Sequence, residues 1–185
     1  MIHISEKHFT GLEAAGVGFV VVVALFMRNL YVWCDGDLPG ILFGAVNNSP
    51  WESCKTLLFP YLLWGVLELM TLRLHTRRYV AAKTLSLYAL ALFYLLMRPW
   101  GAEPIAALLS ICSAFLMSYM LYNSSIPLHG IFPLAVCLLF LFWVLFFSLT
   151  PFPPRLSIFR DETTGMYGIV PRCFDYGAVA QELAP

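Results

Sequence analysis

The stretch Ala14-Ala-Gly-Val-Gly-Phe-Val-Val-Val-Val-Ala-Leu-Phe-Met27 decides the fold, because it is apolar on every side and contains no charged residue. Glu13 and Arg28 bracket this run. A helix that crosses a bilayer needs about 20 mainly apolar residues. We therefore expect residues 9–33 to form a membrane-spanning helix that the protein keeps, rather than a cleaved signal peptide.

Further segments have the same length and apolar character, and we expect them to cross the membrane at residues 51–74, 79–97, 103–122 and 131–149. Their apolar residues surround the whole helix, as expected where the outer face meets lipid. Strands of a membrane barrel would alternate polar and apolar positions, and these runs do not. Residues 1–150 are therefore predicted to form an all-α, polytopic membrane bundle of about five transmembrane helices.

The composition favours the same class of protein. Hydrophobic residues make up 60% of the 185 residues and charged residues only 12%, whereas a soluble domain is about a quarter charged. So few charged side chains cannot cover a surface that faces water, and the lipid bilayer is the expected partner. The net charge of zero provides no field that would attract nucleic acid.

Two segments lie outside the expected spans. Residues 38–46 are apolar but too short to cross, so they form either a re-entrant piece or an interfacial loop against the bundle. Residues 151–185 form a more polar tail. Within it, 156–159 and 166–170 flank the turn-like residues 161–165, a pattern that fits a short β-hairpin or a loosely ordered tail equally well.

Basic residues in short loops indicate which side faces the cytoplasm. The segment between the second and third expected spans is the richest, with Arg73, Arg77, Arg78 and Lys83. We therefore expect this segment and the N-terminus to be cytoplasmic, and the tail to face outward. Three arginines in the tail oppose this orientation.

The segment Val46-Asn-Asn-Ser-Pro-Trp-Glu-Ser-Cys-Lys55 has the strongest local pattern. Ser49 suits the N-cap position, Pro50 suits the first helical position, and the acidic side chain of Glu52 completes a capping box. We expect the Ser49 hydroxyl to accept a hydrogen bond from the Glu52 N–H, and the Glu52 carboxylate to accept one from the Ser49 N–H.

The same segment is a candidate ligand site. Lys55 lies almost one turn after Glu52 on nearly the same helix face, and ionisable groups at membrane depth are costly enough to suggest a function. Either the two residues only pair with each other at headgroup level, or they bind a ligand or ion with their polar neighbours. The candidate ligand-binding residues are Asn47, Asn48, Ser49, Trp51, Glu52, Lys55 and Glu68.

Glu68 is the deepest acid in the expected spans. It lies roughly 24 Å beyond Glu52 along a helix axis and on nearly the opposite face, so the two carboxylates cannot form one acid–base pair. We expect Glu68 to bond a hydroxyl, such as a serine, on another helix, to bind a proton or cation, or to snorkel toward the cytoplasmic side. Glu13 is expected at the membrane interface.

No metal or cofactor is expected from the sequence. The five cysteines contain no C-x-x-C pair, and no residues have zinc-ligand spacing. The sequence does not decide whether two of Cys34, Cys54 and Cys173 form a disulfide. The sequence has no G-x-S-x-G, P-loop or Rossmann glycine pattern, so an enzyme is the less favoured class.

Three motifs are spread over most of the chain. They are His8-Phe-Thr-Gly11, the V-N-x-S-x-W-E-x-x-K segment from Val46 to Lys55 followed by Pro60, and Phe159-x-Asp-x-x-Thr-Gly-x-Tyr-Gly168. These motifs resemble an uncharacterised family of small bacterial multi-pass membrane proteins. The chain departs from the family pattern at Pro50 and Ser53, where members tend to carry Val and His. The resemblance implies a location in the bacterial cell membrane and supplies no activity.

Three hypotheses for function remain open. The leading one is a non-enzymatic protein that binds or passes a small ligand, ion or lipid at the start of the second span. The second is a structural or accessory subunit that packs against another membrane protein or another copy, as the small residues of 11–18 and 102–107 would allow. The third is an intramembrane lipid-modifying enzyme, for which the sequence offers no obvious nucleophile and base.

Overall fold

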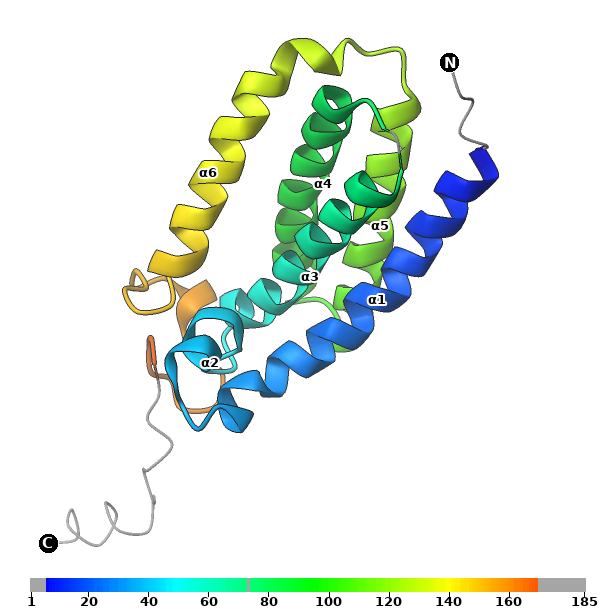
Figure 1. The fold of residues 1–185 in the computed structure, drawn as a ribbon. Helices are drawn as coiled ribbons and strands as arrows, with labels where there is room; N and C mark the ends of the chain where they lie inside the picture. Colours follow the sequence, from blue (N-terminus) through cyan, green and yellow to red (C-terminus); the bar gives the residue numbers. More distant parts are fainter. Residues whose placement is uncertain (1–5, 73, 170–185) are drawn as a thin grey trace, which may run out of the picture.

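The computed structural model describes residues 6–72 and 74–169. This described part is a helical bundle without a β-strand (Figure 1). The long helices are α1 (Glu6–Trp33), α3 (Pro50–Thr71), α4 (Thr76–Met97), α5 (Glu103–Asn123) and α6 (Phe132–Ser148). The short elements are α2 (Leu38–Phe43), η1 (Leu128–Ile131) and η2 (Ser157–Phe159).

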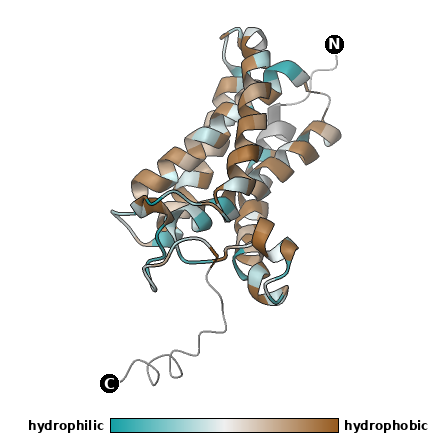
Figure 2. Cartoon of the chain, turned by 90° about the vertical axis from the view of Figure 1, so that its left-hand side faces the viewer, coloured by the Kyte–Doolittle hydropathy of each residue, from teal (hydrophilic) through white to brown (hydrophobic). Residues whose placement is uncertain are grey.

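Three stretches of the described chain are long and apolar enough to cross a membrane: Gly11–Trp33 within α1, all of α4, and all of α5. α6 is apolar but shorter, with 17 residues, and α3 carries three charged side chains. In Figure 2 the hydrophobic colour predominates along the helices, and most of the strongly hydrophilic colour lies near the ends of the bundle. The predicted all-α class is confirmed, and the number of about five spans stays a prediction.

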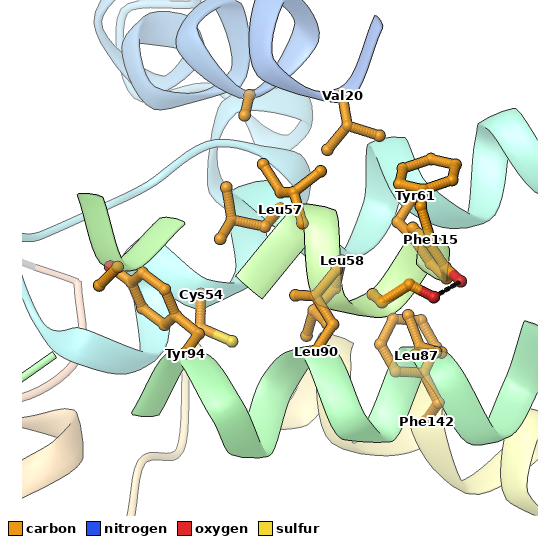
Figure 3. Packing of buried hydrophobic residues seen from close by; sticks show 14 of the residues in the cluster. Val20, Cys54, Leu57, Leu58, Tyr61, Leu87, Leu90, Tyr94, Phe115 and Phe142 are labelled. Carbon is orange, nitrogen blue, oxygen red and sulfur yellow. Dashed lines mark hydrogen bonds between the residues drawn. The ribbon is translucent and has the colours of Figure 1, made fainter. Parts of the chain in front are cut away.

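The apolar core joins side chains from all the long helices (Figure 3). Val20 of α1, Leu58 of α3, Leu87 of α4, Phe115 of α5 and Phe142 of α6 are all buried in it. α1 packs against α3 and α5, while α4 contacts α3, α5 and α6. In a membrane, close packing of this kind holds helices together, because lipid chains are as apolar as the side chains.

The apolar segment after α1 folds back against the end of that helix. α2 contacts α1, and two glycines allow the close approach. A Cβ on Gly40 would lie 2.9 Å from the Tyr31 Cα, and one on Gly44 would lie 2.7 Å from the Tyr31 N. The segment therefore lies against the bundle, and the two predicted arrangements, a re-entrant piece and an interfacial loop, both stay predictions.

The described part of the tail, up to residue 169, does not confirm the expected β-hairpin. It contains η2 and a single antiparallel bridge between Arg160 and Tyr167. The Asp161 carboxylate accepts hydrogen bonds from the N–H and hydroxyl groups of Thr163 and Thr164. Such local bonds hold a turn and compete with the pairing of strands.

Gly16 on α1 offers a test of this packing. An added Cβ would overlap Trp64 Nε1 and lie 2.5 Å from Phe115 Cε1, so we expect Gly16→Ala to destabilise the protein by about 1–3 kcal/mol. Gly18→Ala is the matched control, because nothing lies within 4 Å of its Cβ. It should be neutral or stabilising by up to about 1 kcal/mol. Thermal unfolding in detergent measures both, and equal stabilities would contradict the close contact.

Candidate functional site

Two clusters of buried polar and charged side chains lie inside the bundle. The Glu52 cluster comprises Glu52, Lys55 and Thr150, and the Glu68 cluster comprises Glu13, Glu68, Tyr79, Lys83 and Ser118. Both involve α3, which begins near the first cluster and ends near the second. Between them α3 contributes Leu57, Leu58 and Tyr61 to the apolar core. The two clusters are therefore separate sites.

The Glu52 cluster connects three segments of the chain. Glu52 Oε2 lies 2.7 Å from Lys55 Nζ, and these side chains are 3% and 0% exposed. The Thr150 hydroxyl, just beyond α6, donates to Glu52 Oε1 at 2.8 Å and accepts from Lys55 Nζ at 2.9 Å. Lys55 Nζ also donates to the Ile41 carbonyl, and the Val46 N–H donates to Glu52 Oε2. The cluster thus ties the start of α3 to α2 and to the end of α6.

Half of the predicted capping box is confirmed. The Ser49 hydroxyl accepts a hydrogen bond of 3.2 Å from the Glu52 N–H. The second predicted bond, from the Ser49 N–H to Glu52, is wrong, because the Ser49 N–H donates to the Asn47 side chain at 2.9 Å. The Glu52 carboxylate is instead bound by Lys55 and Thr150.

The two asparagines before α3 bind the tail. The Asn47 side chain donates to the Gly168 carbonyl at 2.7 Å, and the Asn48 N–H donates to the Asp161 carboxylate at 3.1 Å. Burial raises the pKa of Asp161, but hydrogen bonds from the two threonines of the same turn outweigh it and hold the pKa below its usual value. Asp161 is therefore a carboxylate that fixes the tail to the start of α3.

The structure brings most of the predicted ligand-binding residues together and leaves Glu68 apart. The predicted pairing of Glu52 with Lys55 is present, and it is buried. Trp51 packs its ring 5.6 Å from that of Phe159, and its Nε1 is buried without a partner in the described part of the chain. Trp51 Nε1 is therefore a donor that no other described residue uses.

The Glu68 cluster joins four helices. Glu68 Oε2 accepts hydrogen bonds from Lys83 Nζ at 2.7 Å and from the Tyr79 hydroxyl at 2.5 Å. Lys83 Nζ lies 3.5 Å from Glu13 Oε2, and the Ser118 hydroxyl donates to Glu13 Oε1 at 3.4 Å. Each of these residues is at most 5% exposed. Two acids of α1 and α3 thus share one lysine of α4.

The charges of the Glu68 cluster do not balance. Lys83 Nζ is the cation, and it also lies 4.8 Å and 4.5 Å from the ring centres of Tyr61 and Phe115, which stabilise a positive charge. Glu68 Oε1 is buried and has no hydrogen-bond partner among the described residues. With both carboxyls ionised the cluster would carry one excess negative charge, which is costly in a dry interior. It is neutral only when it binds one further positive charge.

Sequence reasoning did not find this cluster. Glu13 was expected at the membrane interface but is buried, with contacts to α4 and α5. Lys83 was assigned to a cytoplasmic loop but lies within α4. Of the expected roles of Glu68, a bond to a hydroxyl on another helix is present, although the hydroxyl belongs to Tyr79 of α4 and not to one of the serines considered. The short turn between α3 and α4 is the signal that could have found part of this cluster. In a helical hairpin, residues at similar distances before and after the turn face each other, as Glu68 and Tyr79 do.

Residues 6–72 and 74–169 contain neither a cluster suited to a metal ion nor a disulfide. No group of three or more His, Cys, Asp or Glu side chains there has an arrangement that would hold a metal ion. Cys34 and Cys54 are free thiols. Cys173, the third candidate for a disulfide, lies outside the described residues.

Within the described residues three helices are long and apolar enough to cross a bilayer, which makes this a helical membrane protein. The family of unknown function DUF6512 matches residues 3–169. The chain therefore belongs to this family, and the predicted resemblance to a family without an assigned function is confirmed. No curated protein and no solved structure matches the chain.

Proposed function

We propose that this chain is a multi-pass protein of the bacterial cell membrane that binds and releases one proton at the Glu68 cluster. The proposal rests on one observation: Glu68 Oε1 is buried without a partner among residues 6–72 and 74–169, in a cluster of two carboxyls and one lysine. A buried cluster with an excess carboxyl gains most by taking up a positive charge. A proton supplies that charge on either carboxyl.

A proton suits this cluster better than a metal ion does. Ions such as Mg²⁺ or Ca²⁺ need about six or more oxygen ligands around them. Glu68 Oε2 is already bound by Lys83 and Tyr79, and Glu13 is bound by Lys83 and Ser118. A proton needs no such shell, and it fits between groups that are already in contact.

The buried Glu68 cluster lies near one end of the bundle. Glu68 lies close to the end of α3 at Thr71. In the other direction, Leu58, Tyr61 and Leu87 fill the core. If basic residues place the turn between α3 and α4 in the cytoplasm, the proton enters from there. The packed apolar core beyond the cluster argues against an open channel through the bundle.

Infrared difference spectroscopy of the detergent-purified protein tests the proposal. We expect a carbonyl stretch from a protonated carboxyl of the cluster to appear as the pH is lowered, because a proton is the positive charge that the cluster lacks. Glu68→Gln or Glu13→Gln should remove or shift this band. Glu162→Gln, at a half-exposed carboxyl, is the control and should leave it unchanged. The absence of a titrating band, or a band that both cluster variants leave intact, would overturn the proposal.

The leading hypothesis from sequence, a ligand site at the start of α3, is less favoured. Thr150 is already hydrogen-bonded to both Glu52 and Lys55, so a ligand would have to displace these contacts within the protein. We assign this segment to holding the fold together. Native mass spectrometry separates the alternatives, since a small molecule lost in Trp51→Phe would support the ligand site. A fixed protein partner would support an accessory subunit. The lipid-modifying enzyme has no specific observation in its favour.

A further inference from the structure

A pocket of about 430 Å³ lies between α1, α3 and α5, and no residue of the two buried clusters lines it. Its apolar walls include Val21 and Leu25 of α1, Leu57 of α3, and Leu108 and Ile111 of α5. The volume falls within the range of about 300–1,000 Å³ that is usual for pockets that bind small molecules. It is large enough for a hydrocarbon chain.

The pocket faces the lipid that would surround the bundle. Leu25 and Leu108 on its walls are 61% and 49% exposed, on the outer surfaces of α1 and α5. Its lining runs along α5 from Glu103, the first residue of that helix, to Ile111. This distance is about 12 Å along the helix axis. When α5 spans a bilayer, the Glu103 end of the pocket lies toward the lipid headgroups and the Ile111 end lies toward the acyl chains.

Two arginines lie at the headgroup end. Arg28 Nη1 lies 2.5 Å from Glu103 Oε1, and Arg98 Nη2 lies 3.8 Å from Glu103 Oε2. Arg98 also pairs with Glu162 of the tail at 2.7 Å, and Glu162 is 48% exposed. The Nε of Arg98 is buried and has no hydrogen-bond partner in the described chain. Both guanidinium groups thus contact the carboxylate of Glu103. In the described chain, the Nε–H of Arg98 is a donor without an acceptor.

We propose that this pocket holds one acyl chain of an anionic phospholipid of the bilayer, with its headgroup phosphate bound by Arg28 and Arg98. Guanidinium groups bind phosphate through paired, charge-assisted hydrogen bonds. The half-exposed Glu162 and the carboxylate of Glu103 are the groups with which the phosphate competes. The site is separate from the Glu68 cluster, so it does not depend on the proposed proton binding.

Native mass spectrometry with added phosphatidylglycerol or phosphatidylcholine tests this site. We expect the wild type to retain one phosphatidylglycerol, with an apparent dissociation constant about tenfold lower than that for phosphatidylcholine. Arg28→Gln and Arg98→Gln should each weaken phosphatidylglycerol binding by about tenfold. Arg77→Gln, an exposed arginine at the start of α4, is the matched control and should change nothing. Ala107→Phe, which fills the pocket, should abolish retention.

Glu103→Gln distinguishes a lipid site from an ion pair that only holds helices together. It removes the carboxylate that competes with the phosphate for both arginines, so phosphatidylglycerol binding should become tighter. Weaker binding in Glu103→Gln would overturn the proposal. So would equal retention of the two lipids, or unchanged retention in Ala107→Phe and in the double variant of Arg28 and Arg98. Circular dichroism of each variant checks that the helices are intact.

Discussion

Lys83→Met is expected to lower the free energy of unfolding by about 3–5 kcal/mol, because it leaves two carboxyls buried without their shared cation. Lys83 Nζ contacts Glu68 at 2.7 Å and Glu13 at 3.5 Å, and it lies over aromatic rings of the core. Methionine fills much of the same volume, so the loss of charge rather than a cavity dominates the effect. Unfolding by SDS or by heat in detergent micelles measures the change.

A second substitution in the same cluster provides the control for this result. In the Lys83→Met background, Glu68→Gln removes one of the two uncompensated carboxyls, and it should restore a large part of the lost stability. Arg77→Gln replaces an exposed cation near the start of the same helix and should stay within about 0.5 kcal/mol of the wild type. If Lys83→Met is as mild as Arg77→Gln, Lys83 is not the partner of both acids.

The helical class of the fold was predictable because it depends on the length of the apolar runs and on the absence of alternating polar positions within them. The run Ala14–Met27 has no charge on any face, and the helix α1 that contains it extends to Trp33. The segments outside the long helices were harder to predict. The segment 38–46 required knowledge of what it packs against, and Gly40 and Gly44 indicate the close contact with α1 only once Tyr31 is known to be beside them.

The candidate sites divide between local and distant contacts. Glu52 and Lys55 are neighbours on one helix face, so their pairing followed from the sequence. Their third partner, Thr150, lies 98 positions after Glu52, and no local pattern indicates it. Lys83 comes 70 positions after Glu13. Contacts over such separations depend on how the helices pack, and local patterns in the sequence do not reveal that packing.

The two clusters have different electrostatic characters, and this difference suggests different roles. The Glu52 cluster has one acid, one base and a threonine that bonds to both, so it is neutral and fully bonded. The Glu68 cluster has one acid more than it has bases, and one of its carboxylate oxygens forms no hydrogen bond within the described part of the chain. A neutral, bonded group is suited to fixing structure, and an unbalanced one is suited to exchanging a charge. This contrast is why the proposed proton site is the second cluster.

Lys55→Met is expected to lower the free energy of unfolding by about 3–5 kcal/mol as well, because it leaves the Glu52 carboxylate buried beside Thr150 alone. The double variant Glu52→Gln with Lys55→Met should recover most of this loss, since the pair is neutral and both charges are removed together. We expect less complete rescue in the Glu68 cluster, where Glu13 stays behind. Unfolding by SDS or heat compares the two pairs of variants directly.

The combination of Lys55→Met and Lys83→Met tests whether the clusters are independent. Glu52 and Glu68, their partners on α3, lie roughly 24 Å apart along that helix, with apolar core between them. Effects at sites this far apart add to within about 0.5 kcal/mol. A larger deviation from additivity would mean that the clusters communicate through the core. In that case the structural role assigned to the Glu52 cluster would have to be joined to the proton exchange proposed for Glu68.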